Sequence, residues 1–316
     1  MRVLMVGRRK SIAFQDLQRY WGEVDFAKPP RLPVKRYDLV IAQEPTIRIG
    51  VPAYLAARLT GAKLVIEVHG DYLEALSPPQ RLVARYLLRR ADHVRAVNNS
   101  VAEKLASIGV KNILTIPAIY IDTSVFKPLK PHIDRPRNII YAGRLVREKN
   151  LPLLLKVFRR VREEVKDATL TIVGEGPEKP VLRRLVKELG LGDSVKLYPW
   201  MPVSSLPRLY SDSAVFALTS SYEGGPRAVF EAGACETPFA AFPVGILREV
   251  AEDGRHGLFA EDWKPETLAR NLTLLLTDPK LREEMGKELR KLTLKHFEWR
   301  KTVKNYAQKY LELAGN

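Results

Sequence analysis

Short apolar, β-branched runs alternate with amphipathic stretches along most of this chain, and this alternation constrains the fold more than any other feature. In the first half, the runs predicted as strands are Arg2 to Val6, Tyr37 to Ala42, Lys63 to Val68, His93 to Val97 and Ile113 to Ile116. Helical periodicity is found between them near residues 51–60, 80–91 and 100–108. Strands that alternate with helices are typical of a parallel sheet with helices on both faces. The sequence therefore predicts an α/β fold.

A second alternating series begins at Asn138, after a segment without periodicity that contains three prolines. The chain has 316 residues, which is long enough for two domains with separate cores. Helical patterning returns over residues 265–313 at the end of the chain. We therefore predict a first domain at residues 1–121, a linker at residues 122–137, a second domain at residues 138–296 and a last helix at residues 297–316.

The most informative motif lies at residues 222–231, which have the sequence YEGGPRAVFE after a predicted strand. Glu223 is thus expected at the carboxyl end of a strand, where open α/β sheets bind ligands. The two glycines at 224–225 let a ligand approach the backbone, and Pro226 suits the start of a helix whose free N–H groups can meet an anion. Glu231 follows about a turn and a half later, so both carboxylates can accept hydrogen bonds from hydroxyls of one ligand. Two solvated acids around a helix start explain the spacing equally well.

A second motif brings cations to the carboxyl end of a strand. The strand predicted at Asn138 to Gly143 is followed by a basic loop and by an amphipathic helix at residues 151–165, for which Asn150 is a good cap. Arg144 and Lys149 lie in that loop. The planar fork of an arginine and the point charge of a lysine suit a diphosphate. The alternative is an ordinary solvated basic loop.

Together these motifs resemble those of the retaining glycosyltransferases of family 4, the group 1 glycosyltransferases, which have the GT-B fold. In the family's order, the chain contains GRLVREKN at residues 143–150, GEGP at 174–177, the E-x7-E pair at 223–231 running into EAGACETP, VGILRE at 244–249 and DGRHGL at 253–258. The resemblance implies two Rossmann-like, doubly wound parallel-sheet domains that face a central cleft. It also implies that the last helix packs back toward the first domain.

The resemblance implies a role for each matching residue. Arg144 and Lys149 would hold the leaving diphosphate of a nucleotide sugar, Glu223 would contact hydroxyls of the donor sugar, and Glu231 would bind the ribose hydroxyls. The loop at Trp200 would lie against the base. The further donor-binding positions are Gly143, Gly174, Met201, Gly224, Gly225 and Arg227.

His69 is the residue of chemical interest in the first domain, because it follows the strand predicted at Lys63 to Val68. The family has a histidine after this strand that lies against the donor sugar near the reacting carbon. His69, together with Glu223, is therefore the predicted catalytic residue, and the alternative is a histidine hydrogen-bonded within its loop. This domain is shorter than is usual in the family and lacks the glycine pair after the first strand, so the acceptor cannot be carried over.

Charge is distributed unevenly. The net charge is +16, and residues 1–130 hold 21 Lys and Arg against 11 Asp and Glu. Arg81, Arg85 and Arg89 repeat at four-residue spacing beside apolar side chains, which suits an anionic membrane surface as well as it suits a solvated helix face. Each such cation contributes about 1 kcal/mol near an anionic leaflet. The basic run Arg8, Arg9 and Lys10 follows the first strand, where it could meet the phosphate of a lipid acceptor.

Other features bear on compartment and cofactor. The single cysteine, Cys235, favours a reducing cytoplasm, and the apolar runs are shorter than the roughly 18 residues that a membrane span requires. We expect a cytoplasmic protein that is peripheral on the inner face of the cell membrane. The sequence has no D-x-D pair and no His/Cys cluster, so we expect no metal and no cofactor.

The resemblance therefore implies a retaining hexosyltransferase of glycan biosynthesis, which we expect to be metal-independent. It would move a sugar from a nucleotide diphosphate sugar to a hydroxyl of a lipid-linked or polysaccharide acceptor. Two alternatives stay open: a nucleotide-sugar epimerase of the GT-B fold, and a basic non-catalytic protein that binds nucleic acid or glycan. Nucleic acid is disfavoured as a partner. A dinucleotide-dependent oxidoreductase is disfavoured because no G-x-G-x-x-G follows a predicted strand.

Overall fold

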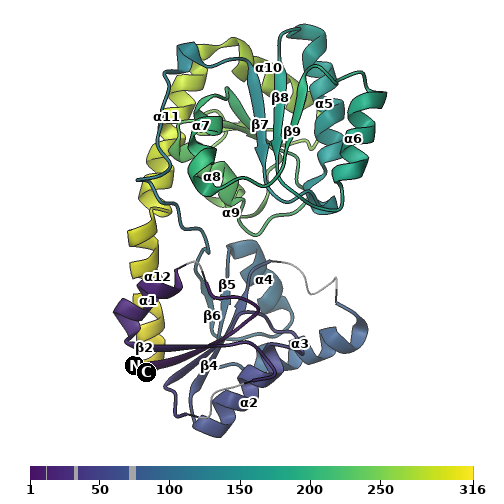
Figure 1. Cartoon of the computed structure of the whole chain (residues 1–316). Coiled ribbons are helices and arrows are strands. Elements are labelled where there is room, and N and C mark those ends of the chain that lie inside the picture. The colour runs from purple at the N-terminus through teal and green to yellow at the C-terminus, as the bar shows by residue number, and fades with distance from the viewer. Residues whose placement is uncertain (12, 32–34, 71–75, 316) are drawn as a thin grey trace. The chain divides into compact units, whose positions relative to one another are not determined.

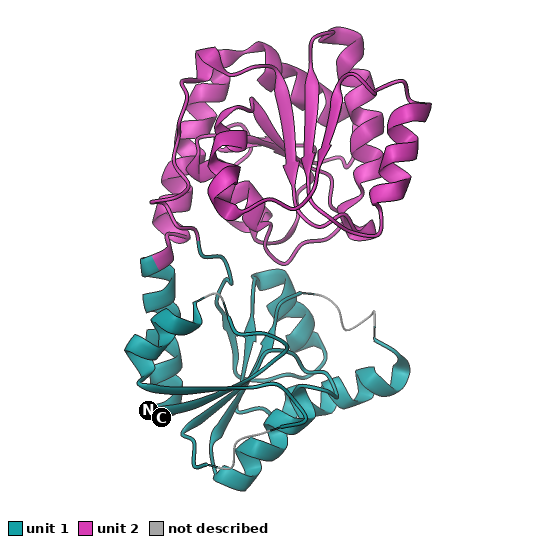
Figure 2. Cartoon of the chain, viewed as in Figure 1, with its two compact units in different colours: residues 1–120, 300–316 teal, residues 121–299 magenta. Residues whose placement is uncertain are grey.

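The computed structural model describes residues 1–11, 13–31, 35–70 and 76–315. The chain divides into two compact units (Figure 2). Unit 1 consists of residues 1–120 and 300–316, and unit 2 consists of residues 121–299. Each unit contains one six-stranded sheet in which all strand pairs are parallel. The predicted α/β fold with two parallel sheets is thereby confirmed.

The sheet of unit 1 has the strand order β2-β1-β3-β4-β5-β6 (Figure 1). Its strands are β1 (Arg2–Val6), β2 (Glu23–Ala27), β3 (Leu39–Ala42), β4 (Lys63–Val68), β5 (His93–Ala96) and β6 (Ile113–Thr115). Its helices are α1 (Phe14–Trp21), α2 (Gly50–Thr60), α3 (Pro78–Arg90), α4 (Asn99–Ser107) and α12 (Trp299–Gly315). The strand order reverses between β1 and β3, so the loops after these two strands flank the switch point.

The two faces of this sheet are covered by different helices. Alternate strand residues such as Leu4, Ile66 and Val94 share one core with apolar side chains of α2, α3 and α4. The intervening positions point to the other face. There, Trp21 of α1 donates from Nε1 to the carbonyl of Ala307 in α12, at 3.0 Å. The last helix of the chain is therefore part of unit 1, although nearly two hundred residues separate it from β6.

The sheet of unit 2 has the order β12-β11-β10-β7-β8-β9. Its strands are β7 (Asn138–Ala142), β8 (Thr169–Val173), β9 (Val195–Tyr198), β10 (Val215–Leu218), β11 (Phe239–Ala241) and β12 (Gly257–Phe259). Its α-helices are α5 (Leu151–Glu164), α6 (Lys179–Glu188), α7 (Leu206–Ser211), α8 (Arg227–Ala234), α9 (Gly245–Val250), α10 (Pro265–Thr277) and α11 (Pro279–His296), with short 3-10 turns η1 (His132–Asp134), η2 (Arg147–Lys149) and η3 (Val203–Ser205). Here the strand order reverses between β7 and β10.

The segment predicted as a linker, residues 122–137, belongs to unit 2 and is anchored there. Arg135 is buried and donates to the Cys235 carbonyl and to Thr237 Oγ1, each at 3.0 Å. Prolines and missing periodicity indicate irregular backbone, but they do not distinguish a free linker from a packed one. The buried arginine is what fixes the segment.

Two elements of the structure were not predicted, and two local predictions differ from it. β2 and α1 were not predicted. The β2 sequence EVDFA mixes charged and apolar positions and so lacks a clear strand pattern. Asn150 precedes α5 with φ near 50°, in the left-handed region, and makes no capping side-chain hydrogen bond. Pro226 occupies the position before α8, whose first helical residue is Arg227.

Candidate functional site

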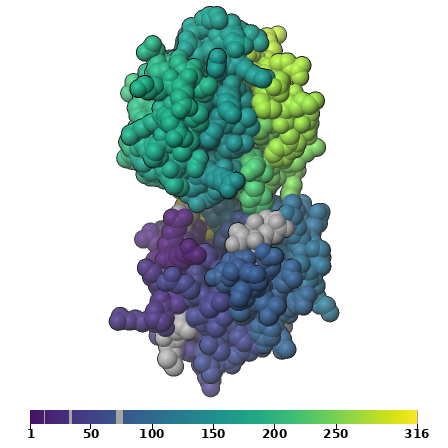
Figure 3. Space-filling view, turned by 90° about the vertical axis from the view of Figure 1, so that its right-hand side faces the viewer, coloured from purple at the N-terminus to yellow at the C-terminus, as the bar shows by residue number. Residues whose placement is uncertain are grey.

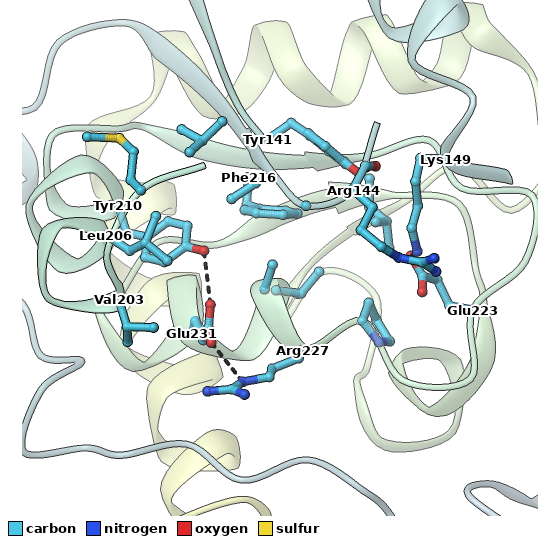
Figure 4. Close-up of a pocket in the computed structure, with 18 of the residues that line it drawn as sticks. Tyr141, Arg144, Lys149, Val203, Leu206, Tyr210, Phe216, Glu223, Arg227 and Glu231 are labelled. Atoms are coloured by element: carbon cyan, nitrogen blue, oxygen red, sulfur yellow. Dashed lines mark hydrogen bonds and ion pairs between the residues drawn. The ribbon is translucent and has the colours of Figure 1, made fainter. Parts of the chain in front are cut away.

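A pocket of about 280 Å³ lies in unit 2 beside the carboxyl ends of β7 and β10. These neighbouring strands mark the switch point of the sheet, which is where open α/β sheets bind ligands. Its walls come from the loops after β7, β9 and β10, from α7 and from the start of α8 (Figure 4). The predicted residues that line it are Gly143, Arg144, Lys149, Trp200, Met201, Glu223, Gly225, Arg227 and Glu231.

Lys149 and Glu223 form an ion pair at one side of the pocket. The distance from Lys149 Nζ to Glu223 Oε1 is 2.6 Å, and the side chains are only 13% and 11% exposed. Ser220 Oγ donates to the same carboxylate oxygen at 2.8 Å, and Thr219 Oγ1 donates to the Lys149 carbonyl at 2.9 Å. The loops after β7 and β10 are thereby tied together. An ammonium group has three donors, so Lys149 can bind a ligand anion without leaving Glu223.

Glu231 lies in another part of the pocket and is 7% exposed. Arg227 Nε lies 2.8 Å from Glu231 Oε1, and the Tyr210 hydroxyl donates to Oε2 at 3.2 Å (Figure 4). Burial raises the pKa of Glu231, and the opposing effects of Arg227 and Tyr210 only partly offset it. A buried carboxylate with few solvent contacts is suited to accept hydrogen bonds from ligand hydroxyls.

Arg144 lies at the rim, where its side chain is 69% exposed and its NH2 group lies 3.5 Å from Glu148 Oε1. The Tyr141 hydroxyl donates to the Arg144 carbonyl at 3.0 Å and so holds the loop. Gly174 lies behind this loop, because a Cβ atom there would lie 1.9 Å from the Gly143 carbonyl oxygen. Gly174 is therefore absent from the described pocket lining, and its contact is with the backbone of the predicted diphosphate loop.

The loop of Glu223 is supported from behind by the start of α9. Gly245 has φ +51°, and a Cβ atom on it would lie 2.2 Å from the Glu223 carbonyl oxygen. The Gly224 carbonyl accepts from Ile246 N at 3.3 Å, and among the described lining residues Gly225 is present while Gly224 is not. The positive φ and the close approach both require glycine at position 245.

The middle of the pocket is apolar and was not predicted from the sequence. Tyr210, Phe216, Val203 and Leu206 line it, and Trp200 stands beside them with 66% of its surface exposed. These side chains have the spacing of ordinary core residues, so no sequence signal separated them from the core. A slot with apolar walls and polar groups near its ends suits a flat heterocycle joined to a charged, hydroxylated chain.

His69 belongs to unit 1, directly after β4. Its Nε2 atom lies 3.3 Å from Glu67 Oε2, and its side chain is 42% exposed. The residues at 71–75 that follow it are outside the described part of the chain. Arg8 follows β1 at the switch point of unit 1 and pairs with Glu44 at 3.1 Å. Arg9 and Lys10 are exposed, and the Lys10 ammonium lies 4.7 Å from the centre of the Phe14 ring.

Two of the three arginines predicted on α3 form hydrogen bonds to backbone carbonyls. Arg89 donates twice to the Ile108 carbonyl just after α4, at 2.9 and 2.7 Å, and Arg81 donates to the Leu76 carbonyl at 3.3 Å. Arg85 is exposed. The side of unit 1 that carries α3 faces the viewer in Figure 3, in violet and blue.

The described residues contain neither a candidate membrane span nor a candidate metal site. None of the helices in the described residues is long and apolar enough to cross a membrane. In the same part of the chain, no group of three or more His, Cys, Asp or Glu side chains is arranged to hold a metal ion.

Both halves of the chain match models of glycosyltransferase families. Residues 125–292 match the family model described as "Glycosyl transferases group 1", and residues 2–118 match the model "Glycosyl transferase 4-like domain". N-acetyl-alpha-D-glucosaminyl L-malate synthase of Bacillus anthracis is 27% identical over 275 residues, which are 83% of this chain and 71% of that protein. Alpha-D-kanosaminyltransferase of Streptomyces kanamyceticus is 24% identical over 258 residues, which are 74% of this chain. The chain spans 66% of the length of that second relative.

Among solved structures, Anabaena Alr3699/HepE in complex with UDP is similar with a TM-score of 0.82. The superposition covers 99% of this chain and 100% of that chain, at 18% sequence identity. At this identity the likeness concerns the fold alone, and it extends over both units.

Proposed function

Because this chain belongs to the group 1 glycosyltransferases, we propose that it transfers a sugar from a nucleotide diphosphate sugar to a hydroxyl acceptor, with retention of anomeric configuration. One observation carries the proposal. The pocket of unit 2 combines a part-buried lysine–glutamate pair, an apolar slot and the buried carboxylate of Glu231 at a sheet switch point.

The proposed donor pose follows the chemistry of the pocket. Glu231 accepts hydrogen bonds from the ribose hydroxyls, and the base lies in the apolar slot near Trp200. Lys149 and Arg144 meet the diphosphate. Lys149 and Ser220 both approach Glu223 Oε1, so the hydroxyls of the donor sugar are assigned to Oε2. The Anabaena structure contains UDP, which makes UDP-sugars the first donors to test.

The proposed chemistry is mainly electrostatic. Negative charge builds on the departing diphosphate when the bond to the anomeric carbon breaks. Lys149 and Arg144 stabilise that charge, because both line the pocket beside the proposed position of the diphosphate. Arg227 N and Val229 N of α8 do not join them, because they donate to the carbonyls of Gly225 and Pro226. In the proposal Lys149 and Arg144 take the role that a divalent ion has in other transferases, so the reaction requires no metal.

The proposed acceptor is lipid-linked or a glycan, and the enzyme works on the inner surface of a membrane. The support is a patch on unit 1, here called the α2–α3 patch. It consists of exposed apolar and basic side chains: Leu55, Leu59, Leu82, Tyr86, Arg58, Arg85 and Arg90. The rings of Tyr54 and Tyr86 lie 6.2 Å apart and join the two helices, and Arg58 donates to the Arg90 carbonyl at 3.3 Å.

The charge and exposure of this patch suit an anionic bilayer. Leu59 and Leu82 are 86% and 74% exposed, and exposed apolar side chains that gather in a patch with a polar rim mark interaction sites. Leucines can enter the headgroup boundary while arginines pair with lipid phosphates. The run Arg8 to Lys10 at the unit 1 switch point is proposed to meet the acceptor phosphate.

The experiment that tests the function is thermal unfolding with a panel of uridine, guanosine and adenosine diphosphate sugars. Ligand at 100 times its dissociation constant adds about 2.7 kcal/mol of stability, which produces a measurable rise in Tm. We expect one nucleotide to raise the Tm, and product analysis with that donor to show transfer to an added hydroxyl acceptor. Absence of a shift with every nucleotide would contradict the proposal. Conversion of the donor to an epimer without an acceptor would replace transfer with epimerisation.

A further inference from the structure

The Glu67 carboxylate is buried under the last helix of the chain. Only 3% of the surface of Glu67 is exposed. Three donors converge on Oε1: Arg95 NH1 at 2.7 Å, the Tyr306 hydroxyl at 2.5 Å and the Tyr310 hydroxyl at 2.8 Å. Burial by itself would raise the pKa of Glu67, but Arg95, His69 and Tyr306 together hold that pKa well below its usual range. Glu67 is therefore an anion at neutral pH.

This arrangement follows from strand register and helix spacing. Glu67 on β4 and Arg95 on β5 are direct register partners, and both point away from the core under α2, α3 and α4. Tyr306 and Tyr310 are separated by about one helical turn of α12, and their rings stack with centroids 4.3 Å apart. Trp21 packs against both rings, with each pair of centroids 5.7 Å apart. The C-terminal helix thus closes the carboxylate site.

The second carboxylate oxygen faces the imidazole of His69. Oε2 lies 3.3 Å from His69 Nε2. An ionised carboxylate only accepts hydrogen bonds, so the ring nitrogen that faces it carries the proton. In the neutral imidazole the other nitrogen, Nδ1, is then an acceptor.

We propose that Glu67 is a positioning residue that fixes His69 as the Nε2–H tautomer and so leaves Nδ1 as an acceptor for a substrate hydroxyl. Tyr306 and Tyr310 of α12 occupy Oε1 and keep Oε2 directed at the histidine. The catalytic use of Nδ1 rests on the proposed sugar transfer and on the catalytic role that the sequence predicts for His69. The tautomer itself does not, and it can be measured without substrate.

The substitution Glu67→Gln gives a sharp test because it exchanges an acceptor for a donor. The amide oxygen of the new side chain stays with Arg95, because a guanidinium can only donate, and it keeps accepting from the hydroxyls of Tyr306 and Tyr310. Its NH2 group then faces His69 Nε2, which must become the acceptor. The tautomer is expected to invert from Nε2–H to Nδ1–H. Tyr310→Phe is the matched control, since it removes one donor from Oε1 and leaves Oε2 facing the ring.

The measurement is the long-range proton–nitrogen NMR spectrum of the histidine rings in the full chain at pH 8. The chain has five histidines, and His69→Gln identifies the signals of His69. We expect Nε2–H in the parent and in Tyr310→Phe, and Nδ1–H in Glu67→Gln. A parent ring protonated at Nδ1 would overturn the proposal even if Glu67→Gln failed to fold. A folded Glu67→Gln with the parental tautomer would overturn it as well.

Activity separates this proposal from the function on which it builds. If Nδ1 acts on the substrate, tautomer inversion lowers kcat by about 100-fold or more. The affinity for the donor, measured by titration, is expected to stay within about twofold of the parent, because the donor pocket belongs to unit 2. Inversion without loss of kcat would remove His69 from the mechanism and leave the positioning role of Glu67 standing.

Discussion

The switch points of the two units differ in what the chain places beside them. In unit 2, two strands lie beyond β7 and two lie beyond β10. The loops at that junction hold Lys149 and Glu223 together as a part-buried pair. In unit 1, only β2 lies beyond β1, and the adjoining basic loop is exposed, with Arg8 paired to Glu44. Paired charges that are largely buried and also line a pocket suit one defined ligand. Exposed charges suit a partner whose shape varies.

The same comparison explains why the carboxylates of the two units have different proposed roles. Glu67 in unit 1 has Oε1 surrounded by three protein donors, so its role is to hold other side chains. Glu223 and Glu231 in unit 2 line a pocket. Burial alone therefore does not mark a ligand-binding acid, whereas burial next to an open cavity does.

The largest effect that the comparison predicts comes from Glu223→Gln. The amide still accepts from Ser220, so the fold should persist, but the charge that orients Lys149 and the sugar is removed. We expect a loss of about 10²- to 10³-fold in transfer rate, similar to the removal of one electrostatic contact in a preorganised site. Circular dichroism and steady-state kinetics measure the two quantities.

Glu175→Gln is the matched control for that variant. Glu175 is an exposed acid in the GEGP turn and pairs with Lys179 at 2.6 Å. Glu175→Gln should retain the parental transfer rate within about twofold, because Glu175 is exposed and is not among the described residues that line the pocket. Similar losses in both variants would break the distinction between buried and exposed charge.

A smaller effect is expected for Glu231→Ala, which should weaken donor binding. Hydrogen bonds to a charged group contribute about 1.5 to 3 kcal/mol, so the donor Kd should rise by about 10- to 100-fold. The rate at saturating donor should change much less, because the ribose is remote from the reacting bond. Titration calorimetry measures the Kd, and equal affinity in variant and parent would sink the ribose assignment.

The contribution of unit 1 is tested by binding to vesicles that contain phosphatidylserine. Arg85→Gln removes one exposed cation from the α2–α3 patch, and about 1 kcal/mol per cation corresponds to roughly fivefold weaker binding. Arg183→Gln on α6 of unit 2, which is also exposed, should bind as the parent does. Equal weakening by both substitutions would mean that vesicle binding depends on the net charge of the protein and not on the α2–α3 patch.

The smallest expected effect concerns pH. Burial raises the pKa of Glu231, so this carboxylate takes up its proton at a higher pH than an ordinary glutamate does. Protonation removes the negative charge and an acceptor, and donor affinity should therefore fall as the pH is lowered from 7.5 toward 5. Glu231→Gln has no such titration, and its Kd should stay flat over that range. A parental slope in Glu231→Gln would assign the pH dependence to another group.

Sequence patterns predicted the parts of the site that depend on local order. The spacing of Glu223 and Glu231 placed both side chains in one pocket, because the turn and the helix between them are local. The Lys149–Glu223 pair was not predicted, since 74 residues separate its members and only the adjacency of β7 and β10 brings them together. The same holds for Tyr210, which approaches Glu231 from a different helix, and for Glu67, which meets tyrosines from the far end of the chain.

The most direct test of the account is hydrogen exchange, read by mass spectrometry, with and without the nucleotide diphosphate that raises the Tm most. The account predicts protection in unit 2, at residues 143–150, 199–203 and 220–231, where the pocket is built. Glu231→Ala should lose that protection at the same nucleotide concentration. Protection confined to residues 1–120 would contradict the assignment of the donor site to unit 2.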